Sequence, residues 1–291
     1  MRYKLIFKVA LLLLVLCVIP FQVQRGQPSA QDVEVEIWFG KQEYLVKEIV
    51  MLHGSLKNNR DTTIYFWADD LYSLTIKDKT GEVYPKKMFT KGWSPGPTHS
   101  LKPGEIRQFY EDVLFTHTIY EGLPVGTYFC FMTLHQYLGG KITSDTVQFV
   151  VKEPTGFEKD AQRLFIEAQK LSWSTGKSDQ AFVAYQQLVK KYPNSVYVPG
   201  AVYGAAVCYL YSDSSEKKKK SVAMYVNLIE DFPGFLSVGR YFLPIYSIYL
   251  SMKDKAGAIK TMKDLIERHP KTKISEEAEY WLEKIEKWEF E

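Results

Sequence analysis

Three copies of one short pattern recur in the second half of the chain, so that half must be built from repeated units. The copies are Leu188–Pro193, Leu228–Pro233 and Leu265–Pro270, and their prolines lie 40 and 37 residues apart. Before each proline, the same order of small and large side chains recurs at helical spacing: Ala181, Tyr185 and Leu188, then Ser221, Tyr225 and Leu228, then Ala258, Met262 and Leu265. Because proline lacks the N–H that would continue a helix, each copy predicts a helix that ends before its proline.

The full spacing, small-x3-large-x2-Leu-x4-Pro, resembles the second helix of a tetratricopeptide repeat. In such repeats two helices pack as a pair, and each pair buries its apolar face only against its neighbours. The resemblance implies an all-α tetratricopeptide-like solenoid of three helix pairs over residues 155–291. A last amphipathic helix over Glu276–Glu289, which carries Trp281 and Trp288, is predicted to cap the final apolar face.

The passage Tyr192–Tyr211, YPNSVYVPGAVYGAAVCYLY, is similar to periplasmic tetratricopeptide proteins of the outer-membrane assembly lipoprotein and Tol-Pal coordinator type. The resemblance implies a non-catalytic adaptor of the bacterial cell envelope that binds a protein or peptide partner. Such solenoids bind on the concave face, which the first helices form. On that face the candidate partner-binding residues are Tyr203, Tyr241 and Tyr249, whose rings either contact an extended peptide or belong to the core.

Residues 31–154 follow a period of two instead of a helical period. Val33, Val35, Ile37 and Phe39 alternate with polar or exposed positions, and further short apolar runs lie at residues 49–56, 63–68, 74–76, 108–113, 128–134 and 146–151. Clusters of turn-forming residues separate the runs. About seven short strands with this alternation predict an antiparallel β-sandwich.

Three motifs in this half build turns: LxIxDxxG from Leu74, LKPGE from Leu101 and PxGxY from Pro124. They resemble the bacterial intracellular proteinase inhibitor domain and the exported Ig-like modules similar to it. The resemblance implies an Ig-like fold without the inter-sheet disulfide, because no cysteine lies in the second strand. The alternative function is a proteinase-inhibitor-like or enzymatic module centred on this sandwich.

Two other segments are candidates for partner contact. Residues 91–100 are rich in Gly and Pro and carry Trp93, which is either a contact residue on an exposed loop or a ring that closes one end of the sandwich. Lys217–Lys220 is a basic run in a predicted turn, which is either solvated or a contact for an acidic lipid or an acidic partner.

Residues 1–30 have the form of an export signal. Arg2, Lys4 and Lys8 precede the uncharged run Val9–Ile19. Such a segment is a signal peptide or, if it is not cleaved, an N-terminal membrane anchor. A third interpretation is a lipoprotein modified at Cys17, because Leu14–Cys17 resembles a bacterial lipobox. Leu16 departs from that pattern, which has a small residue immediately before the cysteine. We expect an exported protein, periplasmic or associated with the cell envelope.

Charge and cysteine usage exclude several kinds of site. The formal net charge of +3 comes from the leader, which holds four basic and no acidic residues, so the rest of the chain is nearly neutral and nucleic acid is not a predicted partner. None of the five histidines is spaced as a metal ligand, and Cys130 and Cys208 fall in different halves as predicted free thiols. We expect no catalytic residue, metal or cofactor.

The chain is therefore predicted to have a leader (1–30), an Ig-like β-sandwich (31–154) and a helical solenoid with a capping helix (155–291). The two halves are expected to fold independently, unless the first helix packs on the sandwich through Phe157, Leu164 and Phe165. Besides the adaptor and the inhibitor or enzyme, a structural spacer that holds another envelope component away from the membrane is the remaining alternative.

Overall fold

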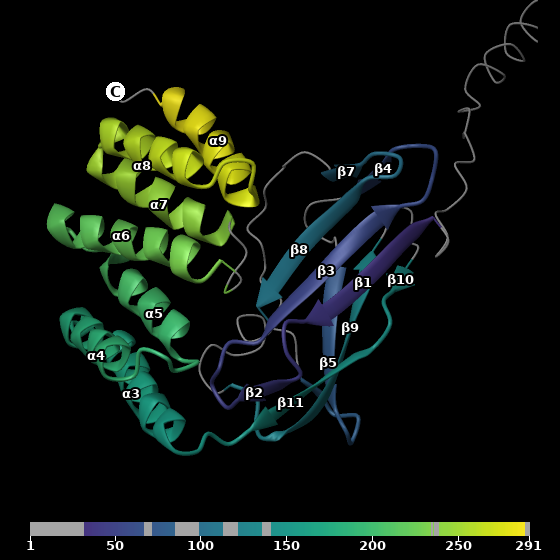
Figure 1. The fold of residues 1–291 in the computed structure, drawn as a ribbon, viewed down its shortest axis with the longest axis horizontal. Helices are drawn as coiled ribbons and strands as arrows, with labels where there is room; N and C mark the ends of the chain where they lie inside the picture. The colour runs from purple at the N-terminus through teal and green to yellow at the C-terminus, as the bar shows by residue number, and fades with distance from the viewer. Residues whose placement is uncertain are drawn as a thin grey trace, which may run out of the picture.

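The computed structural model describes residues 32–66, 72–84, 99–112, 122–135, 141–233, 235 and 239–288. Within these ranges the chain runs through a β-rich region and then a helical region, changing from strand to helix between Lys152 and Phe157. Figure 1 shows the helices stacked in a column beside the strands. Two residues singled out from the sequence, Trp93 and Cys17, lie outside the described residues.

The strands of the described ranges form three sheets. The first contains β1 (Val33–Phe39), β3 (Met51–Asn58) and β8 (Ile106–Asp112) in that order. The second has the order β2 (Glu43–Leu45), β11 (Val147–Lys152), β9 (Gly126–His135), β5 (Tyr72–Asp78) and β6 (Val83–Tyr84), with β10 (Lys141–Thr143) also paired to β9. The third pairs β4 (Ile64–Phe66) with β7 (His99–Leu101).

One strand pair departs from the predicted antiparallel arrangement. β2 runs parallel to β11, with Val150 opposite Glu43, whereas the other pairs in the described ranges are antiparallel. The three residues of β2 cover the edge of β11 that β9 leaves free, and Lys152 pairs with Glu43 at 2.5 Å beside this register. A strand this short carries too little pattern for the sequence to fix its direction.

The first two sheets contribute side chains to one apolar core. On β1, Val33, Val35 and Ile37 are buried while Glu34 and Glu36 are exposed, so alternation directs one face inward. β5 and β9 supply further core residues, including Leu74, Ile76, Tyr128, Cys130 and Met132. The hydroxyl of Tyr128 donates a hydrogen bond to the Pro124 carbonyl at 2.7 Å, which ties β9 to the turn that precedes it.

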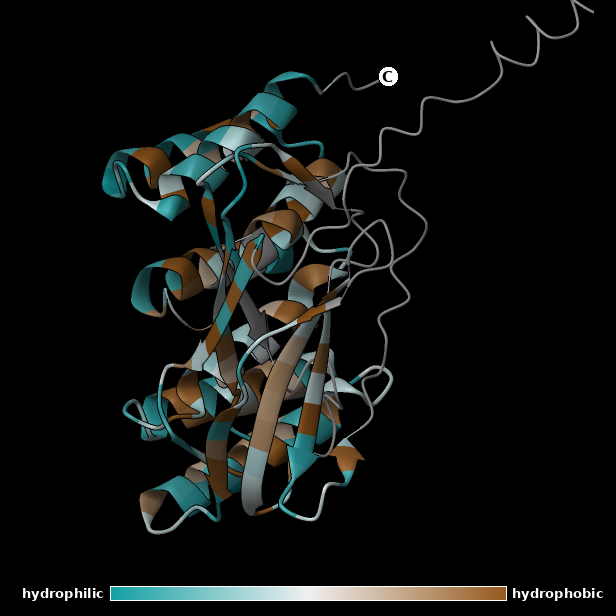
Figure 2. Ribbon diagram, turned by 90° about the vertical axis from the view of Figure 1, so that its right-hand side faces the viewer, coloured by the Kyte–Doolittle hydropathy of each residue, from teal (hydrophilic) through white to brown (hydrophobic). Residues whose placement is uncertain are grey.

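Seven helices follow in the described residues: α3 (Phe157–Ser172), α4 (Ser178–Lys191), α5 (Val198–Leu210), α6 (Ser215–Asp231), α7 (Gly239–Met252), α8 (Lys255–Arg268) and α9 (Lys273–Glu286). Figure 2 shows hydrophobic and hydrophilic residues mixed along the helices, as expected where each helix buries one side. None of them, within the described ranges, is both long and apolar enough to cross a bilayer.

The predicted repeat register is confirmed by burial. Its small, large and Leu positions on α4, α6 and α8 are all buried: Ala181, Tyr185, Leu188, Ser221, Tyr225, Leu228, Ala258, Met262 and Leu265. Helices that follow one another pack together from α3 to α9, so each unit covers the apolar side of the next.

The three second helices also end alike. The residues before the prolines, Tyr192, Phe232 and His269, leave the helical region, with φ between −125° and −135° and ψ between 52° and 61°. Each donates its backbone N–H to the carbonyl of the register Leu four residues earlier, at 2.8 to 3.1 Å. A following proline disfavours helical dihedrals in the residue before it, so the sequence sets all three ends.

The last helix begins three residues earlier than predicted, at Lys273. Thr272 is its N-cap: Thr272 Oγ1 accepts from the Ser275 N–H at 3.4 Å, and Ser275 Oγ accepts from the Thr272 N–H at 3.1 Å. The predicted start at Glu276 would make Ser275 the residue that precedes the helix. Ser275 instead lies in the first turn of the helix and forms a capping box with Thr272. α9 buries Ile274, Ala278 and Ile285 against the preceding helices, as expected of a terminal cap.

Candidate functional site

The three tyrosines predicted on the concave face lie in or beside the core. Tyr241 is fully buried, with its ring 6.4 Å from that of Tyr225. Tyr249 is 8% exposed, and its hydroxyl shares a hydrogen bond of 2.7 Å with Thr261 of α8. Both are therefore packing residues of the helix pairs. Tyr203 is half-buried, packs edge-on to Tyr225 at 6.1 Å and keeps part of its surface exposed.

The exposed side of the first helices carries a different set of apolar residues. Val207 and Tyr211 lie four residues apart at the end of α5, and Leu243 and Leu250 lie seven apart on α7. All four are exposed, and Tyr211 retains 88% of its surface. These exposed apolar residues lie on or next to helices that also carry a buried apolar face.

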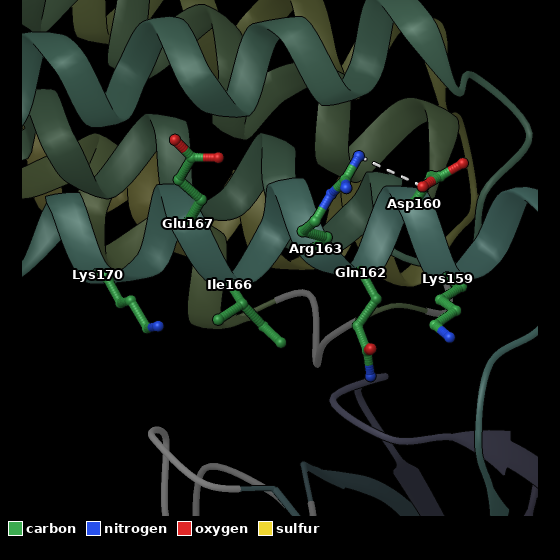
Figure 3. A pocket seen from close by; sticks show the side chains of 7 residues that line it. All are labelled: Lys159, Asp160, Gln162, Arg163, Ile166, Glu167 and Lys170. Atoms are coloured by element: carbon green, nitrogen blue, oxygen red, sulfur yellow. Dashed lines mark ion pairs between the residues drawn. The ribbon is translucent and has the colours of Figure 1, made fainter.

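α3 borders a hollow of about 460 Å³. Its lining residues are Lys159, Asp160, Gln162, Arg163, Ile166, Glu167 and Lys170. Figure 3 shows Lys159, Gln162, Ile166 and Lys170 projecting to the same side of the helix, with Ile166 between the two lysines. Arg163 pairs with Asp160 at 3.4 Å. The hollow thus offers one aliphatic contact flanked by cationic side chains.

The β-rich region docks onto this part of the array through the connection between β2 and β3. The Val46 carbonyl accepts hydrogen bonds from Gln162 Nε2 of α3 at 2.9 Å and from the Tyr197 hydroxyl before α5 at 2.7 Å. Ile49 and Met51 pack against the core formed by α5 to α9. The two halves therefore share an interface, which argues against their predicted independence.

Glu48 is a buried acid at this interface. It is 7% exposed, accepts a hydrogen bond from the Leu45 N–H at 2.9 Å and pairs with Lys41. Burial raises the pKa of its carboxyl, and the nearby Glu158 adds to the increase, although Lys41 opposes it. Glu158 in turn accepts from Ser195 Oγ at 2.6 Å and from the Val196 N–H at 3.2 Å. The docked connection thus carries charge that is held by specific partners.

The thiols and the basic run have structural environments. Burial raises the pKa of Cys130 to about 12 and that of Cys208 to about 11, so both stay protonated at neutral pH and are poor nucleophiles. The basic run lies in the N-terminal part of helix α6 and not in the loop predicted for it. There Lys217 pairs with Asp179 at 2.6 Å and Lys220 pairs with Glu216 at 2.8 Å. In the part of the chain that the structure describes, no three His, Cys, Asp or Glu side chains gather as a metal site.

Comparison with known proteins bears on the two halves differently. Among solved structures, the chain is similar to the sporulation control protein Spo0M of Bacillus subtilis (18% identity, TM-score 0.29, 48% of this chain and 55% of that one). It is also similar to the CARDB domain of PF1109 from Pyrococcus furiosus (16% identity, TM-score 0.26, 42% of this chain and 94% of that one). A third similar structure is the cupredoxin domain of amoB from Nitrosocaldus yellowstonii (15% identity, TM-score 0.27, 45% of this chain and 94% of that one). Similarity at this level carries no conclusion about fold or function. No curated protein matches.

The tetratricopeptide repeat family model matches residues 163–195 and 247–272. The first match covers most of α3 and all of α4, and the second covers the end of α7 and all of α8. The pair α5–α6 between them, which has the longer 40-residue spacing, lies outside the matched ranges. The helical region of this chain is therefore tetratricopeptide-like.

Proposed function

We propose that this protein is a non-catalytic scaffold or adaptor that binds a protein or peptide partner through its helical region. Tetratricopeptide-like arrays mediate protein interactions through the surfaces that their stacked helices expose. The observation that supports the proposal is the apolar surface that the first helices leave outside the core: Val207, Tyr211, Leu243 and Leu250 are exposed, and Ile166 is half-buried at the α3 hollow.

The partner surface on α3 combines apolar and charged contacts. Ile166 lies between Lys159 and Lys170 on one side of the helix. An extended segment that places an apolar side chain on Ile166 would bring its neighbours within reach of these two cations. Tyr203 remains a candidate contact residue, because it is only half-buried.

For the β-rich region we propose an Ig-like β-sandwich that supports the array and does not itself catalyse a reaction. Its first two sheets share one core, and Tyr128 makes the upstream hydrogen bond typical of Ig-like corners. The hydrogen bonds to Val46 would hold this module at a fixed angle to α3 and α5.

We further propose that the protein is exported and works in the bacterial cell envelope, on the evidence of the basic and then apolar residues 1–30. Fractionation of cells that produce the full chain, followed by mass determination, tests this. An envelope-associated product is expected; its mass distinguishes a cleaved leader, an intact anchor and a lipid on Cys17. A full-length product in the cytosol would contradict export.

The binding function is tested by comparing two apolar residues outside the core, the half-buried Ile166 of α3 and the exposed Val183 of α4. Ile166→Glu places a charge in the α3 hollow, whereas Val183→Glu places the same charge on the exposed side of α4. We expect pull-down from an envelope extract to recover a defined partner with the wild type and with Val183→Glu, and to lose it with Ile166→Glu.

Equal melting temperatures for the two variants are the control for folding. Capture that is unaffected by Ile166→Glu would place the binding surface elsewhere. Failure of the wild-type protein to enrich any partner would favour the structural spacer.

A further inference from the structure

A second cavity, separate from the α3 hollow, lies where the β-rich region meets the turns of the helical array. Its volume is about 370 Å³. The β-rich side contributes Gly40, Lys41, Tyr44, Glu48, Ile49, Met51 and His53, and the helical side contributes Val196, Pro199, Phe232 and Phe235. Pockets at such junctions between two folded units are common ligand sites, and about 300 Å³ is the lower end of their usual volume.

The walls of this cavity suit an aromatic ring. The half-buried Phe232 and Phe235 present aromatic surface, Tyr44 adds the edge of a ring that otherwise packs on Phe39 and Phe149, and Met51 adds a thioether, which makes favourable contacts with ring edges. His53 stacks on Trp38 with ring centroids 5.9 Å apart, and burial lowers the pKa of its imidazole. A neutral His53 adds a flat, uncharged surface to the wall. Aromatic partner residues of this kind often supply most of the binding energy at an interface.

The rim of the cavity presents a positive charge. Lys41 pairs with Glu48, but the lysine side chain is 44% exposed whereas the glutamate side chain is only 8% exposed. The ammonium group also lies 4.9 Å from the centroid of the Tyr44 ring. Since an ammonium group has three donors, Lys41 can bind a second carboxylate without leaving Glu48. Both Lys41 and Glu48 line the cavity, but Lys41 is far more exposed and is the charge that a ligand approaching from solvent meets first.

We propose that the junction cavity binds a peptide segment in which an aromatic residue is followed by an acidic one. The aromatic side chain enters between Met51 and Phe235, and the neighbouring carboxylate pairs with Lys41 at the rim. Both halves of the protein line the site, so this ligand contacts the β-rich region and the array together. The proposal does not depend on a partner at the α3 hollow.

Gly40 provides a way to close the cavity without disturbing the fold. It lines the cavity, and its backbone is not among those with positive φ in the described residues. Among the described residues, a Cβ atom added there would have one heavy atom within 4 Å, His53 Nε2 at 3.5 Å. Gly40→Leu is expected to fill part of the cavity, while the matched control Gly40→Ala adds a methyl group and leaves it open.

The test uses the full chain and four blocked eight-residue peptides, identical except for a central Phe-Asp, Phe-Lys, Phe-Gln or Ala-Asp pair. The methyl signal of Met51, assigned with Met51→Leu, reports the ring current of a bound aromatic side chain. We expect Phe-Asp to shift this signal and to bind at least about tenfold more tightly than Ala-Asp, as for an aromatic anchor in a pocket. Phe-Lys should bind more weakly than Phe-Gln.

The variants separate the two parts of the site. Gly40→Leu should weaken Phe-Asp binding about tenfold or more, Gly40→Ala should leave it within about twofold, and Lys41→Gln should reduce it to the level of Phe-Gln. If Gly40→Leu lowers the melting temperature, its effect on binding is set aside. The proposal is then tested by Lys41→Gln and by the four peptides with the wild-type protein. The proposal is overturned if no Phe peptide shifts the Met51 signal, or if Phe-Asp has no advantage over Phe-Lys.

Discussion

Among single residues, the small position of the repeat register holds alanine in two repeats and serine in the third, and all three residues are fully buried. Ser221 replaces the alanine found at Ala181 and Ala258, and it is fully buried. Its hydroxyl donates to the Ala206 carbonyl at 2.7 Å, which ties α6 to α5 and leaves the hydroxyl paired. A small polar residue is therefore compatible with the register where a helix carbonyl of the previous unit lies within reach.

The leucine of each repeat should contribute strongly to stability. Leu188 and Leu228 have no exposed surface, so truncation to alanine at either position leaves a cavity between helices. We expect Leu228→Ala and Leu188→Ala each to lower the free energy of unfolding by about 2–5 kcal/mol in urea denaturation. The exposed control Val183→Ala should change it by less than about 0.5 kcal/mol. Losses as small as the control at both leucines would show the register to be misassigned.

Gly204 is needed because the ring of Tyr185 lies against its backbone. A Cβ atom there would come within 2.4 Å of Tyr185 Cζ, and the tyrosine is itself buried between helices. Gly204→Ala is therefore expected to cost about 1–3 kcal/mol by overpacking. Combining it with Tyr185→Leu, which shortens the opposing side chain, should cost less than the sum of the two single changes in a double-mutant cycle. Simple additivity would contradict this contact.

Glu48 should make stability depend on pH. Burial raises the pKa of this carboxyl above its ordinary value of 4.5. The protonated carboxyl therefore contributes to the stability of the fold fully below pH 4.5, and this contribution is lost as the pH rises through the raised pKa. Glu48→Gln remains neutral and keeps an acceptor for the Leu45 N–H. We expect the melting temperature of Glu48→Gln, relative to wild type, to increase as the pH is raised from 4.5 to 7. A decrease would mean that the pair with Lys41 outweighs burial.

At the scale of elements, α9 completes the array by covering the exposed side of the last helix pair. Trp281 and Trp288 pack on Tyr246 of α7, with ring centroids 4.8 and 4.9 Å away, and Trp288 Nε1 donates to the Tyr246 hydroxyl at 2.9 Å. Lys255 Nζ donates to the Glu286 and Trp288 carbonyls and so holds the end of the helix. The last apolar surface of the repeats is shielded by aromatic residues.

Removal of α9 should therefore expose that surface. We expect a chain that ends at Pro270 to aggregate, and a chain that ends at Pro233 to do so more strongly, because each loses the neighbour that its last unit requires. Size-exclusion chromatography and a thermal melt provide the measurement. Monomeric, cooperatively melting products would count against a continuous array.

The sequence predicts the second helices well because every constraint on them is local. Helical spacing, the register leucine and the proline act within one unit, and they set both the burial and the end of each helix. The buried face of the first helices is harder to predict, because α5 and α7 are apolar on more than one side. The spacing of apolar residues alone does not show which side packs against a neighbouring helix. The prediction therefore places Tyr241 and Tyr249 on a binding face, whereas in the structure both are buried and Leu243 and Leu250 are exposed.

At the scale of the whole molecule, contacts distant in the sequence join the two halves. The Tyr197 hydroxyl meets a carbonyl 151 residues away, and no local pattern in Leu45–Met51 distinguishes a segment that docks on helices from an ordinary strand. The parallel pairing of β2 is part of the same arrangement. Such contacts depend on the packed surfaces of both halves, which one sequence does not display.

Separating the halves should uncover this interface. We expect residues 31–154 and 155–291, expressed apart, each to melt at a lower temperature than residues 31–291, because Ile49 and Met51 lose their apolar contacts. In the joined chain, limited proteolysis should spare Lys152–Glu158, where Pro154 is buried. Unchanged melting temperatures, or preferential cleavage in that segment, would restore the independent-domain interpretation.

The docked connection between β2 and β3 also sets an order of events during synthesis. Ile49 and Met51 are made early, but the helices that cover them are made more than a hundred residues later. Until α5 to α7 have formed, the first half carries an uncovered apolar segment next to the buried acid Glu48. Docking of this connection therefore cannot precede α5 to α7, which makes it a late step of folding, and until then Ile49 and Met51 lack the apolar contacts of the finished protein.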